Sequence, residues 1–253
     1  NQLSSNGVIK ITIPREIISL LKINCFERFS VNSYKELTSR LVDLNDLDFS
    51  NLAKKSNRLY NKSTCNKINK WVENSDYLKS LLDAQELRIS PLSSYELNLL
   101  KNHSEYNLDI FFRIVRKNKM DIGPAHIDRL LWEQSIGTNA EVKIRSNEKR
   151  WKIWIPIDGM EQNNSLQFVR GSHLENVPYF LDSSRITQTT KATGAKGSPS
   201  IQIEWISKNE ANFLSEAWEH GEGALFHDDI VHRGPINRST ELRISAEFTV
   251  LAS

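Results

Sequence analysis

The chain has 253 residues, of which 39% are hydrophobic and 25% charged, and its formal net charge is +2. These values are ordinary for a globular protein, and the length suffices for one large domain, which we expect to span residues 1–253. No apolar run is long enough to span a membrane, and basic residues are interspersed with acidic ones. The composition therefore argues against a nucleic acid or a membrane as partner.

Two cysteines occur, Cys25 and Cys65, and they lack the spacing of a metal site or a redox motif. Buried, unreactive thiols are therefore expected. This cysteine usage fits a reducing compartment and predicts a cytoplasmic protein.

The N-terminal part of the sequence is typical of helices. Residues 8–13 (VIKITI) alternate between apolar and polar side chains from Ile9 onward and are rich in β-branched residues, so they predict a strand, after which Pro14 opens a helix. Ser33 with Glu36 has the spacing of a capping box, and Ser93 with Glu96 repeats it. We therefore expect residues 14–104 to be mostly helical, with helices at 14–21, 33–44, 71–82 and from about 93.

From Leu108 onward the sequence is typical of short β-strands. The predicted strands are residues 108–115, 125–132, 151–157, 166–169, 201–205, 224–226, 230–232 and 243–251. Many short strands favour a sandwich or barrel over a βαβ repeat. The expected fold class is α+β: a jelly-roll core, or double-stranded β-helix, at residues 108–251, buttressed by the N-terminal helices. Residues 182–200 contain few large apolar side chains and are interpreted either as a lid over a site or as a loop insertion.

One constellation of residues points to metal chemistry. In a strand, residues i and i+2 share a face, so His126 and Asp128 would present an imidazole and a carboxylate side by side. Downstream, His232 ends a predicted strand, a Pro/Asn turn follows, and Arg243 begins the next strand. Two imidazoles and one carboxylate suit ferrous iron and leave coordination positions open. A hairpin would return Arg243 beside the metal, where its guanidinium can grip a carboxylate with two hydrogen bonds.

These motifs resemble the phytanoyl-CoA dioxygenase (PhyH) family of Fe(II)- and 2-oxoglutarate-dependent oxygenases. The resemblance is carried by four segments: His126-Ile-Asp128, Trp154-Ile-Pro-Ile-Asp158, Asn163 to His173, and His232 with Asn237 and Arg243. Arg170 stands where the family usually has Pro, and Asn164 or Ser165 where a turn Gly is common. Both departures fall in a turn rather than at the metal.

The resemblance implies roles for individual residues. His126, Asp128 and His232 match the metal ligands, and Arg243 matches the residue that binds the distal carboxylate of 2-oxoglutarate. Trp154 falls near a position that lines the co-substrate pocket. The implied cofactors are Fe(II), 2-oxoglutarate as co-substrate and O2. The implied reaction is hydroxylation of a substrate C–H with release of succinate and CO2; desaturation or ring chemistry remains open.

Further residues have two interpretations each. Ser245 shares a strand face with Arg243 and either adds a hydroxyl to the same carboxylate or packs in the core. Arg113 and Arg129 either bind the substrate or are surface cations. His227 is interpreted as a packing residue rather than a ligand, and the Asp228–Asp229 pair as a solvated turn.

Three alternatives to this hydroxylase function are weighed against the residues. Halogenation is disfavoured because Asp128 fills the position that related halogenases leave to chloride. A cupin-like metal enzyme that does not use 2-oxoglutarate would have no need of Arg243, and a non-catalytic jelly-roll binding module would have no need of the triad. No cluster of basic residues suited to coenzyme A is evident, which disfavours an acyl-CoA thioester as substrate. The polar, Ser/Thr/Lys-rich stretch 182–200 leads us to expect a small polar metabolite or biosynthetic intermediate instead.

Overall fold

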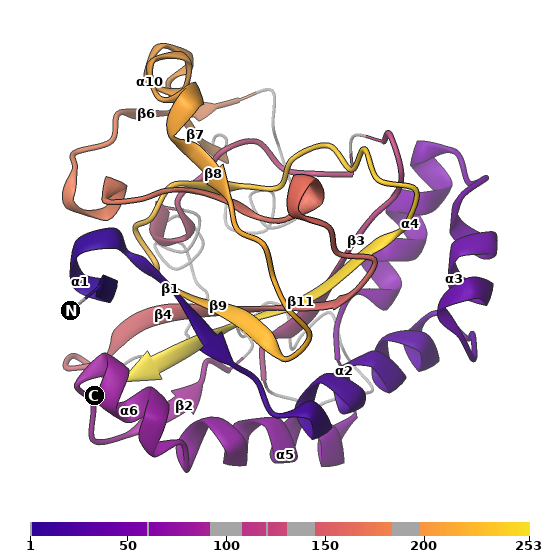
Figure 1. Cartoon of the computed structure of the whole chain (residues 1–253), viewed down its shortest axis with the longest axis horizontal. Helices are drawn as coiled ribbons and strands as arrows, with labels where there is room; N and C mark the ends of the chain where they lie inside the picture. The colour runs from indigo at the N-terminus through magenta and orange to yellow at the C-terminus, as the bar shows by residue number, and fades with distance from the viewer. Residues whose placement is uncertain (1, 60, 92–107, 120, 131–144, 184–197) are drawn as a thin grey trace.

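The computed structural model describes residues 2–59, 61–91, 108–119, 121–130, 145–183 and 198–253 (Figure 1). The helix predicted from residue 93 and residues 184–197 of the polar stretch lie outside this part of the chain.

A six-stranded antiparallel sheet forms the larger wall of the fold. Its order is β1-β9-β4-β11-β2, and β3 also pairs with β11, beside β2. The strands are β1 (Val8–Thr12), β2 (Leu87–Ile89), β3 (Ile110–Val115), β4 (Lys149–Asp158), β9 (Glu222–His227) and β11 (Arg243–Ala252). The ten-residue strands β4 and β11 lie next to each other, so they form the centre on which the site is built.

A smaller sheet packs against the inner face of this wall. Its order is β10-β5-β8, formed by β5 (Gln167–Val169), β8 (Phe213–Ser215) and β10 (His232–Arg233). Phe168 of β5 contacts Phe226 of β9, with ring centroids 5.1 Å apart, and both belong to one buried cluster with Trp154. A separate pair, β6 (Tyr179–Asp182) with β7 (Ser198–Ile201), lies near the short helix α10 (Ile203–Lys208) (Figure 1).

Helices cover the outer face of the larger sheet. They are α2 (Arg15–Arg28), α3 (Tyr34–Leu41), α4 (Asp46–Ser56), α5 (Lys62–Glu73) and α6 (Asp76–Leu82), preceded by α1 (Gln2–Asn6). Figure 1 shows α2 and α5 running beneath the strands. Ile153, Ile155 and Ile157 of β4 join the apolar core on this side, whereas Trp154 joins the cluster between the sheets. The alternation of β4 thus separates a helix-packed face from an inner face.

The expected fold class, an α+β jelly roll buttressed by N-terminal helices, is confirmed. Helix starts follow the predicted chemistry: the Ser33 side chain accepts a hydrogen bond from the Glu36 N–H at 3.2 Å, and Pro14 precedes α2. Cys25 and Cys65 are free and buried, as expected. No helix among the described residues is long and apolar enough to cross a membrane.

Several predicted elements are wrong in type or extent. The predicted strand 125–132 is only a bridge at His126, and residues 128–130 begin a helical turn. The predicted strand 201–205 ends at Ile201, and α10 follows because Trp205 and Ile206 together pack on a core cluster while Ile203 is 70% exposed. Asn74 and Ser75 divide the predicted helix 71–82 between α5 and α6, and β2 is a strand inside the region expected to be helical.

The helix-packed core sets the stability of the wall that carries the site. Ile155→Ala removes a fully buried side chain, so we expect the free energy of unfolding to fall by about 2–5 kcal/mol. Ile23→Ala, at a position that is 54% exposed, is the control and should cost about 1 kcal/mol or less. Urea denaturation at constant slope measures both, and equal losses would contradict this packing.

Candidate active site

Two backbone hydrogen bonds join His126 to His232. The His126 N–H donates to the His232 carbonyl at 3.0 Å, and the His232 N–H donates to the His126 carbonyl at 3.1 Å. This antiparallel bridge holds residues 106 positions apart in sequence side by side, with ring centroids 4.3 Å apart. The two imidazoles therefore share one location although no regular sheet joins them.

Local hydrogen bonds orient both rings. His126 Nδ1 lies 2.8 Å from the Pro124 carbonyl, and His232 Nδ1 lies 3.1 Å from the Ile230 carbonyl. Because a carbonyl only accepts, each Nδ1 carries the proton and each Nε2 keeps a free lone pair.

The third member of the cluster is Asp128. Its Oδ1 lies 3.8 Å from His126 Nε2, and its Oδ2 lies 3.7 Å from His232 Nε2. One ligand atom from each of the three residues lies within 4.8 Å of the others. The cluster therefore has the donor set and the spacing of a site for one metal ion.

Burial and charge favour the ligand forms of these groups. Burial lowers the pKa of His126 to about 4, and the adjacent His232 contributes, so this imidazole is neutral near pH 7. Burial alone raises the pKa of the Asp128 carboxyl, but the positive charges around it, first that of Lys152, bring it well below its ordinary value. A neutral imidazole beside an ionised carboxylate is what a divalent cation requires.

Arg243 and Ser245 bring unsatisfied polar atoms to the inner face of β11. Both residues are buried, and Arg243 Nε and Ser245 Oγ have no hydrogen-bond partner among the described residues. Burial lowers the pKa of Arg243 to about 10. Within the described chain no carboxylate forms an ion pair with this guanidinium. A buried cation next to an unpaired hydroxyl is suited to an anionic ligand.

A buried hydrogen-bond network, which the sequence analysis did not predict, holds Arg243 in place. The Asn164 amide donates to Asn237 Oδ1 at 3.1 Å and to Ser239 Oγ at 3.0 Å, while the Asn164 carbonyl accepts from the Arg243 guanidinium. Asn237 in turn donates to the Val115 carbonyl at 3.0 Å. This network connects the loops around the start of β11 and fixes the position of the Arg243 guanidinium.

Sequence reasoning also missed the buried charge of Lys152 on the inner face of the barrel and the acid that contacts Arg113. Lys152 is buried with Nζ 3.7 Å from Asp128 Oδ2. Arg113 contacts Glu247 with Nη2 3.1 Å from Oε1. The available signal was the alternation of β4, in which Arg150 and Lys152 share the parity of inward-facing Trp154.

Asp228 corrects an expectation. It lies in a turn with Asp229, but it is buried rather than solvated, and its Oδ2 lies 3.0 Å from an Nη of Arg150. Burial raises the pKa of Asp228 to about 7, although Arg150 acts against this shift.

The remaining candidates take varied positions. Trp154 is buried on the inner face and meets Trp218 edge to face at 5.4 Å. Arg129 forms an ion pair with Asp229, and its side chain is 45% exposed. His227 lies outside the triad and packs edge to face on Trp151, with centroids 4.9 Å apart.

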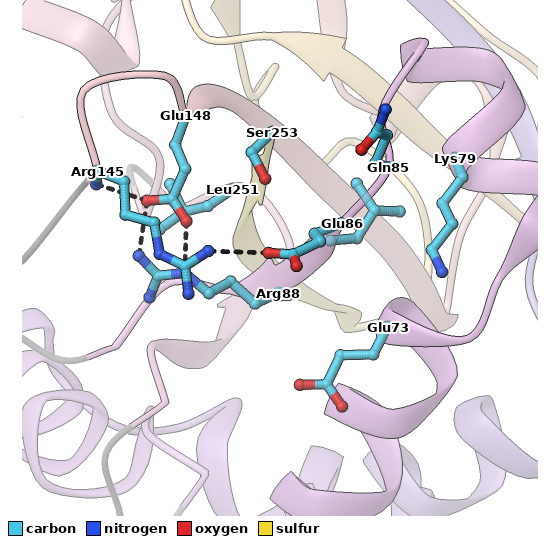
Figure 2. Close-up of a pocket in the computed structure, with 10 residues that line it drawn as sticks. Glu73, Lys79, Gln85, Glu86, Arg88, Arg145, Glu148, Leu251 and Ser253 are labelled. Atoms are coloured by element: carbon cyan, nitrogen blue, oxygen red, sulfur yellow. Dashed lines mark hydrogen bonds and ion pairs between the residues drawn. The ribbon is translucent and has the colours of Figure 1, made fainter.

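A distinct surface pocket of about 260 Å³ lies where β2, the segment just before β4 and the end of β11 meet α5 and α6 (Figure 2). Its charged groups largely satisfy one another: Arg88 contacts both oxygens of Glu148 at 2.6 and 2.7 Å, and Arg145 contacts Glu86 at 2.8 Å. It contains no residue of the triad.

A jelly roll that brings two histidines and one carboxylate together and buries an arginine on the same inner face defines a class of non-haem metal oxygenases. The family profile described as "Phytanoyl-CoA dioxygenase (PhyH)" matches residues 26–245. The chain therefore belongs to the PhyH family of 2-oxoglutarate-dependent oxygenases, as the sequence motifs predicted. No curated protein sequence matches it significantly.

Solved structures share the fold at low sequence identity. EctD from S. alaskensis, with 2-oxoglutarate and 5-hydroxyectoine, is 11% identical with a TM-score of 0.58, covering 99% of this chain and 74% of that one. HygX from Streptomyces hygroscopicus, with nickel and 2-oxoglutarate bound, is 10% identical with a TM-score of 0.52, covering 99% and 85%. EvdO2 from Micromonospora carbonacea var. aurantiaca, complexed with 2-oxoglutarate, is 11% identical with a TM-score of 0.51, covering 100% and 89%.

The pKa of Asp228 predicts a pH dependence of stability. The folded state holds this proton up to about pH 7, whereas the unfolded chain releases it near 3.8, so raising the pH across this window favours unfolding. The free energy of unfolding should therefore fall more between about pH 5 and about pH 7.5 in the wild type than in Asp228→Asn. Denaturation of metal-free protein measures this difference, with Asp229→Asn as control. Parallel wild-type and Asp228→Asn profiles would refute the shift.

Proposed function

We propose that the protein is an Fe(II)- and 2-oxoglutarate-dependent hydroxylase of a small polar metabolite or biosynthetic intermediate. His126, Asp128 and His232 hold the iron. Family membership supports the reaction class, and the donor set of two imidazoles and one carboxylate supports the metal. The reaction consumes substrate C–H, O2 and 2-oxoglutarate, and yields substrate C–OH, succinate and CO2.

The observation that carries the proposal is the buried Arg243 without an acidic partner in the described chain. Its free Nε and the free Ser245 Oγ lie two residues apart on one strand face, where they bind the distal carboxylate of 2-oxoglutarate. Trp154, on the adjacent strand, forms part of the wall of this co-substrate site. A metal enzyme that does not bind a carboxylate here would leave the arginine uncompensated.

Iron bound to the triad supplies oxygen activation, and the protein supplies binding and orientation. The carbonyl contacts at Nδ1 fix both imidazoles with Nε2 toward the ion. Arg243 fixes the direction in which the dicarboxylate enters. Arg113 and Arg129, whose side chains are 55% and 45% exposed, meet the substrate. Their charges favour a substrate with polar or acidic groups.

The first test measures succinate formation from 2-oxoglutarate under air, with and without added Fe(II). We expect slow iron-dependent turnover in the wild type and losses of at least about a hundredfold in Asp128→Ala and Arg243→Ala. Arg238→Ala, an exposed arginine five residues before Arg243, is the control and should keep full activity. Iron binding without any affinity for 2-oxoglutarate would favour the cupin-like alternative instead.

Gly234 offers a sharper test of the co-substrate site. A Cβ at Gly234 would lie 2.9 Å from Arg243 Nη2, so Gly234→Ala should push the guanidinium aside and raise the Kd for 2-oxoglutarate by about tenfold. Mn(II) affinity should not change, because the triad is untouched. Gly123→Ala is the matched control, since its Cβ would meet nothing within 4 Å. Anaerobic titration of Mn(II)-loaded protein measures both constants; an unchanged Kd for 2-oxoglutarate in Gly234→Ala would place the carboxylate elsewhere.

A further inference from the structure

Lys152 is a buried cation with unused hydrogen-bonding capacity. Its side chain is 9% exposed; Nζ lies 3.7 Å from Asp128 Oδ2 and 5.7 Å from the centre of the Phe111 ring. The first distance is too long for a hydrogen bond, and no described residue accepts one from this ammonium group. The ammonium group has therefore exchanged water for an incomplete set of partners, which is unfavourable unless a ligand completes it.

The neighbouring inward cations are better compensated. Arg113 has Nε and Nη2 at 3.3 and 3.1 Å from Glu247 Oε1. Arg150 has an Nη 3.0 Å from Asp228 Oδ2. Of these four inward-facing cations in the described part of the chain, Lys152 and Arg243 are thus the two with no carboxylate oxygen at hydrogen-bonding distance.

These two cations lie toward opposite ends of the inner face. Lys152 of β4 pairs in register with Thr249 of β11, six positions along that strand from Arg243. Of the two cations, Lys152 is the one that lies beside the triad, because its Nζ is 3.7 Å from Asp128 Oδ2. An extended dicarboxylate that reaches from Arg243 to the metal would therefore meet a second cation at its metal-binding end.

We propose that Lys152 is the second cation of the co-substrate site and pairs with the carboxylate at the keto-acid end of 2-oxoglutarate. The inference rests on the proposed function, in which Arg243 takes the distal carboxylate. One cation at each end matches the charge of the dianion, and the ligand supplies the acceptors that the Lys152 ammonium lacks.

The test compares 2-oxoglutarate with oxalate, which keeps a chelating acid end but has no distal carboxylate. Both are titrated anaerobically into Mn(II)-loaded wild type, Lys152→Met, Lys152→Arg and Arg243→Met. Lys152→Met should raise the Kd of both ligands by about tenfold or more, because the lost contact is charge-assisted. Lys152→Arg, which keeps the charge, should recover part of the affinity. Lys149→Met, the same change at an exposed position on β4, is the control and should match the wild type.

The same experiment separates this inference from the proposed function. Arg243→Met should weaken 2-oxoglutarate and leave oxalate unchanged. If Arg243→Met leaves both ligands unchanged, the proposed co-substrate site fails. If Arg243→Met behaves as expected but Lys152→Met binds both ligands like the wild type, only the role of Lys152 is overturned.

Metal affinity distinguishes ligand binding from support of Asp128. Removing a positive charge beside the site reduces its repulsion of a divalent cation, so apo Lys152→Met should bind Mn(II) at least as tightly as the wild type. If Lys152 instead held Asp128 in place for the metal, Mn(II) affinity would fall, and the proposal would be overturned. Thermal unfolding of each variant confirms that the comparison is made on folded protein.

Discussion

The site depends on the two backbone hydrogen bonds between His126 and His232. They join the segment around His126, which precedes β4 and β11 in the chain, to the short strand β10. The described residues form only an isolated bridge here, without the further backbone hydrogen bonds of a regular sheet. The proximity of the two imidazole rings follows from this pairing. The ring centroids lie 4.3 Å apart, and a carbonyl two residues earlier in each segment holds Nδ1, so that both Nε2 atoms face Asp128. Side-chain chemistry is therefore set by backbone geometry.

The two faces of strand β11 serve different purposes, one for stability and the other for chemistry. Its even-numbered residues, such as Ile244, Ala246 and Phe248, belong to the core shared with the helices. Odd-numbered Arg243 and Ser245 face the other way with unsatisfied polar atoms. Because the helical layer supplies the apolar burial, the inner face can carry groups that would destabilise an ordinary core.

Features that depend on residue types and their order could be predicted from the sequence. Features that depend on contacts between distant segments could not. The clustering of His126, Asp128 and His232 was predictable because their residue types and order along the chain form a motif. The expected strand through Asp128 was wrong, since a short run of apolar alternation is also compatible with a bridge followed by a helical turn. The burial of Asp228 was missed for a different reason: a pair of aspartates in a turn usually faces water, and only the position of Arg150 reverses this.

The charged side chains inside the barrel differ in how far they are buried and in how closely they contact an acid. The Arg150–Asp228 pair is nearly buried, with an Nη of Arg150 3.0 Å from Asp228 Oδ2. The Arg113–Glu247 pair is open to solvent on the arginine side, with 55% of that side chain exposed. A buried cation that already contacts an acid gains little from an added anion, whereas a buried cation with free donors gains most when an anion arrives. The distribution of acids, more than the number of bases, therefore determines where this barrel can accept a negatively charged molecule.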